Sequence, residues 1–437
     1  MIDTRSTLSE LTIVGGAALP EDDFSAALLV TGGSPRLERL RVTHGTGIVV
    51  AGGAAGTIER CQIDDNDSGI DVYGASPILQ DNDIWGNEVF EIGVWSDGSD
   101  PTIRGNRIHD GQNYGIRVGN GASPRIEDNE VWGNALAGIG VRDAGSDPTI
   151  RANRIHDGQE GGILVAGGAS PRIEENEVWG IVLDGIFVGG AGTNPTIRAN
   201  RIHDGLGVGI LVHGGASPRI EENEVWANAS AGIVVRDAGS DPAIRANRVH
   251  DGQQAGIFVR DGASPTIEEN EIWGSVLSGI VITDRGSDPT IRANRVHDGQ
   301  QAGIFVRDGA SPTIEENEIW GNTAAEVAVQ NAGSDPAIRA NRIHQGAGVG
   351  ILVFEGASPR IEDNEIWANV GEGLRVEGSG TAPYVIGNII RDGQDDGIWV
   401  RNGAGPVIND NAITGNALEA IRVEEFAVPL IGENQFE

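Results

Sequence analysis

The stretch Pro148-Thr-Ile-Arg-Ala-Asn153-Arg-Ile-His-Asp-Gly158-Gln-Glu-Gly-Gly-Ile163-Leu-Val165-Ala-Gly-Gly-Ala-Ser-Pro171 decides the fold of this chain. It contains three short runs of alternating side chains, Thr-Ile-Arg, Arg-Ile-His and Ile-Leu-Val, with glycine, asparagine, serine or proline between them. Alternation with a period of two predicts β-strands, and the residues between the runs predict turns. The segment therefore predicts three short strands joined by tight bends.

An asparagine returns with this unit every 23 or 24 residues. A unit of this size cannot bury its own apolar residues, so successive units must stack as parallel strands about 4.8 Å apart. The sequence predicts an all-β fold: one single-stranded right-handed parallel β-helix of about 19 coils of 21–24 residues. The asparagine positions, which we interpret as a structural ladder at a bend that tolerates left-handed backbone, are Asn82, Asn106, Asn129, Asn153, Asn176, Asn200, Asn223, Asn247, Asn270, Asn294, Asn317, Asn341, Asn364, Asn388, Asn411 and Asn434.

The two spacings alternate because one turn of each pair is a residue shorter. Some coils turn through residues 142–148, and the next turn through residues 166–171, so the true repeat has 47 residues. Residues 247–274 and 294–321 are identical, which indicates a duplication of one such unit. We expect an N-terminal cap and first coil at residues 1–35, the β-helix at 36–434, and an uncapped end at 435–437 whose open strand edge would meet further chain or a partner.

Composition limits the partners of this chain. The net charge of −33 opposes binding to nucleic acid or to an anionic membrane, because the long-range field repels both. No run is apolar enough for a membrane span or a secretory signal, so we expect a cytoplasmic protein. The single cysteine, Cys61, excludes an internal disulfide, and its place in the asparagine column predicts a small buried residue.

Strand alternation places Ile150, Ile155 and Ile163 inside the coil and Arg151, Arg154, His156 and Leu164 outside. Beside the bend, arginines of one set of coils lie between glutamates of the next, which we interpret as pairs that fix the register. The arginines of this set are Arg104, Arg107, Arg151, Arg154, Arg198 and Arg201, and the glutamates are Glu127, Glu130, Glu174, Glu177, Glu221 and Glu224.

A second outer column alternates tryptophan and histidine. Histidines two coils apart are separated by about 9.6 Å, too far to share one metal ion, so no metal site and no cofactor are predicted. Stacked rings in a half-buried ladder are one interpretation, and tryptophans free to stack on sugars or on a partner are the other. The candidate aromatic binding residues are Trp132, Trp179, Trp226, Trp273, Trp320 and Trp367.

A third outer column is apolar, although alternation predicts that it faces solvent. A continuous stripe of this kind exceeds what monomers usually expose, which favours a contact surface; burial under a loop or among neighbours is the alternative. The candidate residues are Leu164, Phe187, Leu211, Val234, Phe258, Val281, Phe305 and Leu352.

The run at residues 147–165 resembles the pectin-lyase-like β-helix repeats of carbohydrate-binding and sugar-hydrolase modules, and is similar to the repeats of β-helix F-box proteins and of periplasmic copper-maturation proteins. The resemblance extends over about residues 75–434 and implies the fold, which serves lyases, epimerases and binding scaffolds alike. No F-box segment precedes the repeats in this sequence, so ubiquitin-ligase work is not expected.

Pectate lyases carry calcium-binding acids and an arginine on long irregular loops, whereas the turns here keep nearly one length. The aspartates that follow the histidines recur as copies, which favours a turn role over a catalytic one. We therefore predict no catalytic residues, and a non-catalytic scaffold or binding module for protein–protein interaction or self-assembly through the apolar and Trp/His columns. The alternative is a polysaccharide-binding or polysaccharide-cleaving protein, which leaves carbohydrate open as a partner; a second alternative is an acidic DNA mimic.

Overall fold

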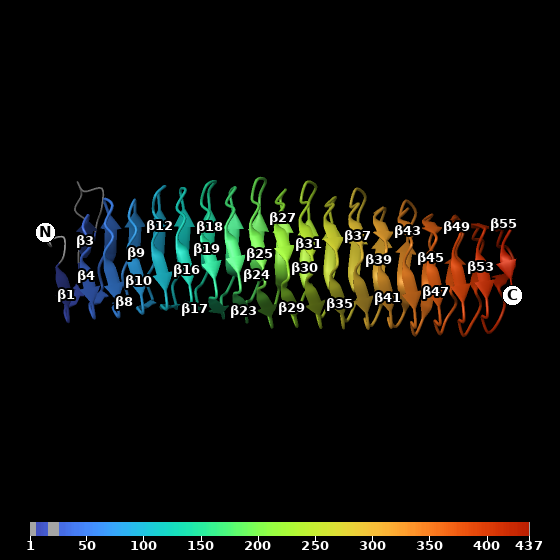
Figure 1. Ribbon diagram of the computed structural model, residues 1–437, viewed down its shortest axis with the longest axis horizontal. Helices are drawn as coiled ribbons and strands as arrows, with labels where there is room; N and C mark the ends of the chain where they lie inside the picture. The colour runs from blue at the N-terminus through green and yellow to red at the C-terminus, as the bar shows by residue number, and fades with distance from the viewer. Residues whose placement is uncertain (1–5, 16–25, 437) are drawn as a thin grey trace. The chain divides into compact units, whose positions relative to one another are not determined.

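The computed structural model describes residues 6–15 and 26–436. The chain divides into two compact units: unit 1 is Met1–Leu211 with Ala216–Arg219, and unit 2 is Val212–Gly215 with Ile220–Glu437. In each unit the coils follow one another in chain order, and each strand lies beside the equivalent strand of the next coil (Figure 1). The strands pair in parallel within each unit, and the described residues contain no helix.

A coil consists of up to three strands, one for each of three parallel sheets.

The strands of the first sheet are β1 (Thr7–Ser9), β4 (Arg36–Glu38), β7 (Thr57–Glu59), β10 (Ile78–Gln80), β13 (Thr102–Arg104), β16 (Arg125–Glu127), β19 (Thr149–Arg151), β22 (Arg172–Glu174), β25 (Thr196–Arg198), β28 (Arg219–Glu221), β31 (Ala243–Arg245), β34 (Thr266–Glu268), β37 (Thr290–Arg292), β40 (Thr313–Glu315), β43 (Ala337–Arg339), β46 (Arg360–Glu362), β49 (Tyr384–Ile386), β52 (Val407–Asn409) and β55 (Leu430–Ile431).

The strands of the second sheet are β2 (Thr12–Val14), β5 (Arg41–Thr43), β8 (Gln62–Asp64), β11 (Asp83–Trp85), β14 (Arg107–His109), β17 (Glu130–Trp132), β20 (Arg154–His156), β23 (Glu177–Trp179), β26 (Arg201–His203), β29 (Glu224–Trp226), β32 (Arg248–His250), β35 (Glu271–Trp273), β38 (Arg295–His297), β41 (Glu318–Trp320), β44 (Arg342–His344), β47 (Glu365–Trp367), β50 (Ile389–Arg391), β53 (Ala412–Thr414) and β56 (Gln435–Phe436).

The strands of the third sheet are β3 (Leu28–Thr31), β6 (Ile48–Ala51), β9 (Ser68–Tyr73), β12 (Phe90–Trp95), β15 (Tyr114–Gly119), β18 (Ala137–Arg142), β21 (Gly161–Ala166), β24 (Asp184–Gly189), β27 (Val208–His213), β30 (Ile233–Arg236), β33 (Ile257–Arg260), β36 (Ile280–Thr283), β39 (Ala302–Arg307), β42 (Ala325–Gln330), β45 (Val349–Phe354), β48 (Leu374–Glu377), β51 (Ile398–Arg401) and β54 (Ile421–Val423).

The core of each unit is the stack of inward apolar side chains. In unit 1, Ile103, Ile126 and Ile150 are in register and are fully buried. In unit 2, Ile267 and Ile291 repeat the arrangement. The predicted all-β parallel β-helix is therefore confirmed. Of the predicted cap at residues 1–35, residues 1–5 and 16–25 lie outside the described residues, and the rest contains β1, β2 and β3, which pair with β4, β5 and β6.

Buried hydroxyl groups hold the longer of the two turn types. Ser146 Oγ accepts a hydrogen bond from the backbone N–H of Gly121, and Thr193 Oγ1 accepts one from Gly168, both at 3.0 Å. Thr193 also donates to the carbonyl of Gly189. Each hydroxyl thus joins its own turn to the turn of the preceding coil. The fully buried members of the set are Ser99, Ser146, Thr193, Ser240, Ser287, Ser334 and Thr381.

Candidate binding surfaces on the outer faces

The asparagine ladder is a buried hydrogen-bonded column in both units. Asn153 donates its side-chain amide to Ile126 O and to Asn176 Oδ1, and its backbone N–H also donates to Asn176 Oδ1. The left-handed residue of the bend is not the asparagine, as the sequence interpretation had it, but the residue before it: Ala152 has φ 53°. The asparagine is therefore needed for its side-chain hydrogen bonds to neighbouring coils, and not for a left-handed backbone, which the preceding residue adopts.

A second buried asparagine column was missed by the sequence analysis. It follows the tryptophans, and its signal is the recurring Trp-Gly-Asn or Trp-Ala-Asn triplet. Asn134 Oδ1 accepts from the N–H of Gly111, and Asn322 Oδ1 accepts from Gly299. The members of this column that are buried or half-buried are Asn66, Asn87, Asn134, Asn228, Asn322, Asn369 and Asn416.

Two buried glutamates, Glu91 and Glu326, form hydrogen bonds with asparagines of this second column and fill the space beside a glycine of the next coil. Glu326 accepts hydrogen bonds from the backbone N–H of Asn322, at 3.0 Å, and from its side-chain amide. The carboxyl group fills the space beside Gly346, where a Cβ would collide with it. Burial raises the pKa of Glu326 to about 8, and burial raises that of Glu91, which is bonded to Asn87 in the same way, to about 8.

The tryptophans and histidines of the second sheet form stacks of parallel rings in each unit. Around His156, the ring centroids lie 5.8 Å from Trp132 and 4.3 Å from Trp179, with interplanar angles of 4° and 16°. Arg154 lies over the Trp179 ring at 5.3 Å. Ring faces are therefore covered by neighbouring coils, and tryptophans such as Trp273, between His250 and His297, leave only their edges free to stack on a ligand.

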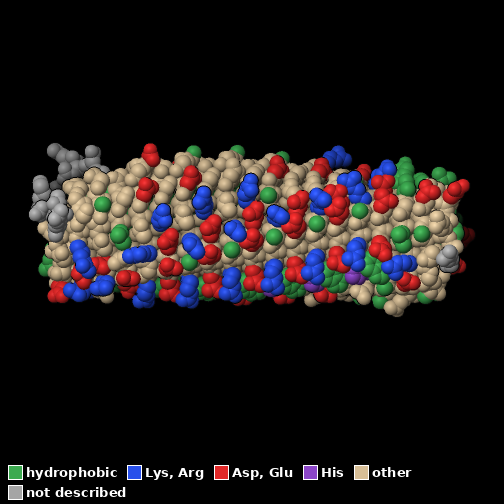
Figure 2. Space-filling view, viewed as in Figure 1, with side chains coloured by type: hydrophobic (Ala, Val, Ile, Leu, Met, Phe, Trp, Pro, Cys, Tyr) green, Lys and Arg blue, Asp and Glu red, His purple; other side chains and the backbone are tan. Residues whose placement is uncertain are grey.

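The arginines and glutamates beside the bend form ion pairs between coils, as the register requires (Figure 2). Arg154 contacts Glu130 of the preceding coil at 3.3 Å. Arg151, however, is aligned with Glu174 but bonds Glu175 at 2.8 Å. Because these side chains are about half exposed, each pair contributes little to stability, and their role in the register is the larger one.

The apolar column of the third sheet is more buried than alternation predicts. Leu211, Val234 and Val281 are 9%, 5% and 8% exposed, so the expectation that they face solvent is wrong for these three. Leu164, Phe187, Phe258, Phe305 and Leu352 are half-buried. In unit 2, Phe305 and Leu352 pack against a cluster that includes Ala328. Side chains of successive coils cover one another because the coils lie only about 4.8 Å apart.

An open groove interrupts this column in unit 2. It has a volume of about 390 Å³, and its lining includes Phe258, Phe305 and Val281. Leu277, which is 45% exposed, and the amides of Gln254 and Gln301 line it as well. Arg307 lies over the Phe305 ring at 5.6 Å, and Arg260 lies over Phe258 at 5.7 Å. The Nε atoms of both arginines are buried without a hydrogen-bond partner.

Unit 1 carries a different set of residues on the same sheet, which sequence reasoning also missed. Asp71, Gly93, Arg117 and Gly140 occupy equivalent positions in four successive coils. Trp95 donates its Nε1 hydrogen to Asp71 Oδ1 at 3.1 Å. Burial raises the pKa of Asp71 and lowers that of Arg117. The signal in the sequence was the presence of aspartate, glycine and arginine in a column that is apolar from Leu164 to Leu352 and contains arginine again at Arg375 and Arg422.

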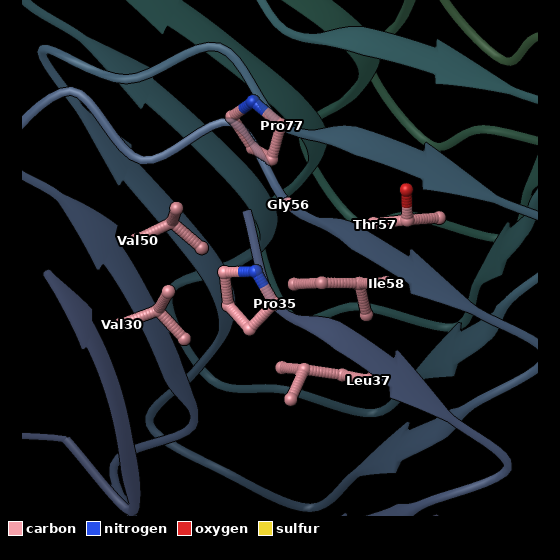
Figure 3. Close-up of a pocket in the computed structure, with 8 residues that line it drawn as sticks. All are labelled: Val30, Pro35, Leu37, Val50, Gly56, Thr57, Ile58 and Pro77. Atoms are coloured by element: carbon pink, nitrogen blue, oxygen red, sulfur yellow. The ribbon is translucent and has the colours of Figure 1, made fainter. Parts of the chain in front are cut away.

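The cavity near the N-terminus and the thiol of Cys61 are disfavoured as sites by size and chemistry. The cavity near the N-terminus, shown in Figure 3, has a volume of about 10 Å³ and is lined by Val30, Pro35, Leu37, Val50, Gly56, Thr57, Ile58 and Pro77. It is at the limit for one water molecule and its walls are largely apolar. Cys61 is buried, as predicted, and burial raises its pKa, which disfavours a reactive thiolate. Within the described ranges, no group of three or more His, Cys, Asp or Glu side chains is arranged to hold a metal ion.

None of the described residues forms a helix long and apolar enough to cross a membrane. No curated protein matches the chain. Similar solved structures include a mutant of the periplasmic alginate epimerase AlgG (14% identity, 74% of this chain and 77% of that chain, TM-score 0.44) and the Dettilon tailspike protein (14%, 72% and 60%, 0.41). Pectate lyase Pel9A is also similar (14%, 55% and 67%, 0.32).

The family described as right handed beta helix region matches residues 7–155, 137–294 and 278–436, which overlap and together cover nearly the whole chain. These matches also supply the handedness that parallel strands and short turns favour. The chain therefore belongs to the right-handed parallel β-helix family.

Proposed function

We propose that this protein binds a polysaccharide chain, and that the groove over Phe258 and Phe305 is its binding surface. Sugar rings present apolar C–H faces and polar hydroxyl edges. A surface that binds them combines aromatic side chains with planar hydrogen-bonding groups. The groove offers both, because its lining includes two phenylalanines, Phe258 and Phe305, and two glutamines, Gln254 and Gln301. Each glutamine amide can donate and accept at once, as a hydroxyl group requires.

The observation that carries this proposal is the translational repeat within the groove. The residues around Phe258 recur around Phe305, because residues 247–274 and 294–321 are identical. The two sets lie two coils apart, or about 9.6 Å along unit 2. A polymer of repeating rings can meet the same set of groups twice. The surface of a globular protein has no such translational repeat, so it would use the two sets unequally.

The scaffold role predicted from the sequence is less favoured, because the apolar column is largely covered by its own neighbours and the tryptophan faces are covered by stacking. A DNA-mimic role is disfavoured by the alternation of arginine with acidic side chains, which breaks the acidic field (Figure 2). Proteins of similar fold include an alginate epimerase and a pectate lyase. Their TM-scores lie below 0.5, so the proposal rests on the groove.

One observation keeps self-association or protein binding as a second candidate. At the bend before the third sheet, apolar side chains are exposed at several coils: Val182, Leu183, Leu206, Leu277 and Val370 are 36% to 67% exposed. Exposed apolar residues at recurring positions are typical of contact surfaces. Light scattering over a range of concentrations tests this role directly, with Leu277→Asp as the variant that would dissociate an assembly.

The experiment for polysaccharide binding is isothermal titration with xylan, galactan, alginate and polygalacturonate. We expect one of these to bind, and we expect Phe258→Ala plus Phe305→Ala to lower its affinity at least tenfold. Leu164→Ala is the matched control, because Leu164 occupies the equivalent column position in unit 1 and does not line the groove. Circular dichroism checks that each variant is folded. Unchanged affinity of the folded double variant, or no binding by any of the four glycans, would contradict the proposal.

A further inference from the structure

Arg117 on β15 of unit 1 lies between two aromatic rings. Its guanidinium carbon is 5.7 Å from the centre of the Trp95 ring and 5.4 Å from the centre of the Tyr114 ring. Its position in the column is flanked by Gly93 in the preceding coil and by Gly140 in the next. Arginine stacked on aromatic faces keeps its N–H edge free for a ligand, because stacking uses only the flat face of the guanidinium.

The glycines around Arg117 are required by these rings. A Cβ on Gly93 would collide first with Asp71 Oδ1 and would lie 2.6 Å from Trp95 Nε1, and a Cβ on Gly140 would lie 2.5 Å from the Tyr114 ring. A Cβ on Gly119 would lie 3.2 Å from the Trp95 ring as well. Distances below 3.0 Å are not tolerated, so apolar residues of the kind found in other coils would displace both rings. The site is therefore built by the sequence of four coils together.

Arg117 has no carboxylate partner among the residues that the structure describes. The single hydrogen bond of its guanidinium is from Nη1 to the carbonyl of Val118, at 2.7 Å. Asp143 and Arg142 of the next coil are the charged groups near enough to influence it, and neither forms an ion pair with it. Asp71 lies two coils away in the same column and accepts the hydrogen of Trp95 Nε1.

Arg117 is half-buried, and two aromatic rings and one hydrogen bond replace part of its lost hydration, but its charge has no counter-ion among the described residues, which favours the binding of an anion. From this geometry we propose that Arg117, Trp95 and Tyr114 form a binding site for a ring-shaped ligand that carries a single carboxylate. The guanidinium donates two parallel hydrogen bonds to the carboxylate, and the ring of the ligand packs beside Trp95. Asp71 is a positioning residue, because it fixes the indole through Nε1.

We restrict the ligand to a single negative charge because the surroundings of Arg117 are acidic. A chain with many carboxylates meets the field of a protein of net charge −33; in addition, Asp71 occupies the same column two coils before Arg117, and Asp143 of the next coil acts on the charge of Arg117. This proposal does not depend on the groove in unit 2, since it uses other residues of another unit. The two sites can therefore be tested, and can fail, separately.

The experiment is isothermal titration of the full chain at low salt with glucuronate, benzoate and glucose. We expect at least one of the two carboxylates to bind and glucose not to bind, and the stronger of the two carboxylates identifies the ring as a sugar or an aromatic one. Arg117→Gln should lower the affinity at least tenfold. Arg142→Gln removes the same charge from an exposed neighbour and should change the affinity less than twofold.

Arg117→Lys keeps the charge but loses the planar fork, so it should bind at an intermediate affinity if it folds. Polygalacturonate should bind to this site at least tenfold more weakly per carboxylate than the stronger of the two single carboxylates. The proposal is overturned if neither carboxylate binds, or if folded Arg117→Gln binds as tightly as the unchanged protein. Equal binding of polygalacturonate through Arg117 would overturn its restriction to single charges.

Discussion

Replacing Glu326 by glutamine should remove a dependence of stability on pH from unit 2. The carboxyl of Glu326 is fully buried, and its hydrogen bonds come from the backbone and side-chain amides of Asn322. Burial disfavours the charged form, so the pKa of Glu326 rises from 4.5 to about 8 in the folded protein. The unfolded chain loses this proton near pH 4.5, whereas the folded protein keeps it until about pH 8.

The sign and size of the effect follow from these two pKa values. Between pH 4.5 and pH 8 the folded state binds one proton more than the unfolded state, so the free energy of unfolding falls as the pH rises. The fall is about 1.4 kcal/mol per pH unit, or about 5 kcal/mol over the full interval, for a shift from 4.5 to about 8. This loss in the free energy of unfolding is absent below pH 4.5 and complete above pH 8.

Urea unfolding of both proteins, followed by far-ultraviolet circular dichroism at pH 4.5, 6, 7, 8 and 9, measures this quantity. A glutamine at position 326 loses or rearranges one hydrogen bond to Asn322, but that cost does not depend on pH. The difference in unfolding free energy between Glu326→Gln and the unchanged protein should therefore shift by about 5 kcal/mol in favour of the variant from pH 4.5 to pH 9. Glu355→Gln, at an exposed site, is the control. A difference that stays within 1 kcal/mol across this range would refute the reasoning.

Two further predictions concern the bend. Ala246 has a left-handed backbone with φ 53°, so Ala246→Gly should stabilise unit 2 by about 0.5–1 kcal/mol in urea unfolding. Ala243 is an exposed strand residue, and Ala243→Gly, the control, should destabilise unit 2 by a similar amount. If Ala246→Gly does not stabilise the protein, the backbone argument is contradicted. Asn270→Ala should cost about 3 kcal/mol, because it leaves the buried N–H of Asn247 without a partner and removes the side-chain hydrogen bond to Ile244 O. The exposed Gln253→Ala is its control, and an equal cost for both would remove the ladder as a source of stability.

Short-range patterns in the sequence were enough to predict most of the fold. The alternation in residues 148–171 indicated the strands, and the 23- and 24-residue spacing indicated that equivalent strands pair in parallel, as Ile126 does with Ile150. These inferences succeeded because a stack of identical coils turns sequence period directly into register. The second asparagine column is also periodic: from Asn87 on its members fall on a 47-residue spacing, most of them two places after a tryptophan, and Ile181 and Ser275 stand in place of asparagine at two of these positions.

The binding surfaces were harder to predict, because exposure depends on neighbouring coils. Alternation places Val281 outside, but Phe258 and Phe305 lie beside it in the adjacent coils and leave it 8% exposed. The same proximity covers the faces of Trp273 with two histidine rings. A sequence shows which way a side chain points from its own strand, and it does not show how far the side chains above and below reach over it.

The sequence by itself determined the class of fold, the length of the repeat and the inward residues, because these follow from periods of 2 and of 47 residues and from turn chemistry. The tertiary structure alone decided which outer residues remain accessible. Stacking of the coils opens a groove at Phe258 and Phe305. It also places Arg117 between Trp95 and Tyr114, next to glycines of the coils on either side. Those outcomes depend on the volumes of side chains 23 or 24 residues apart, which meet only when the coils stack.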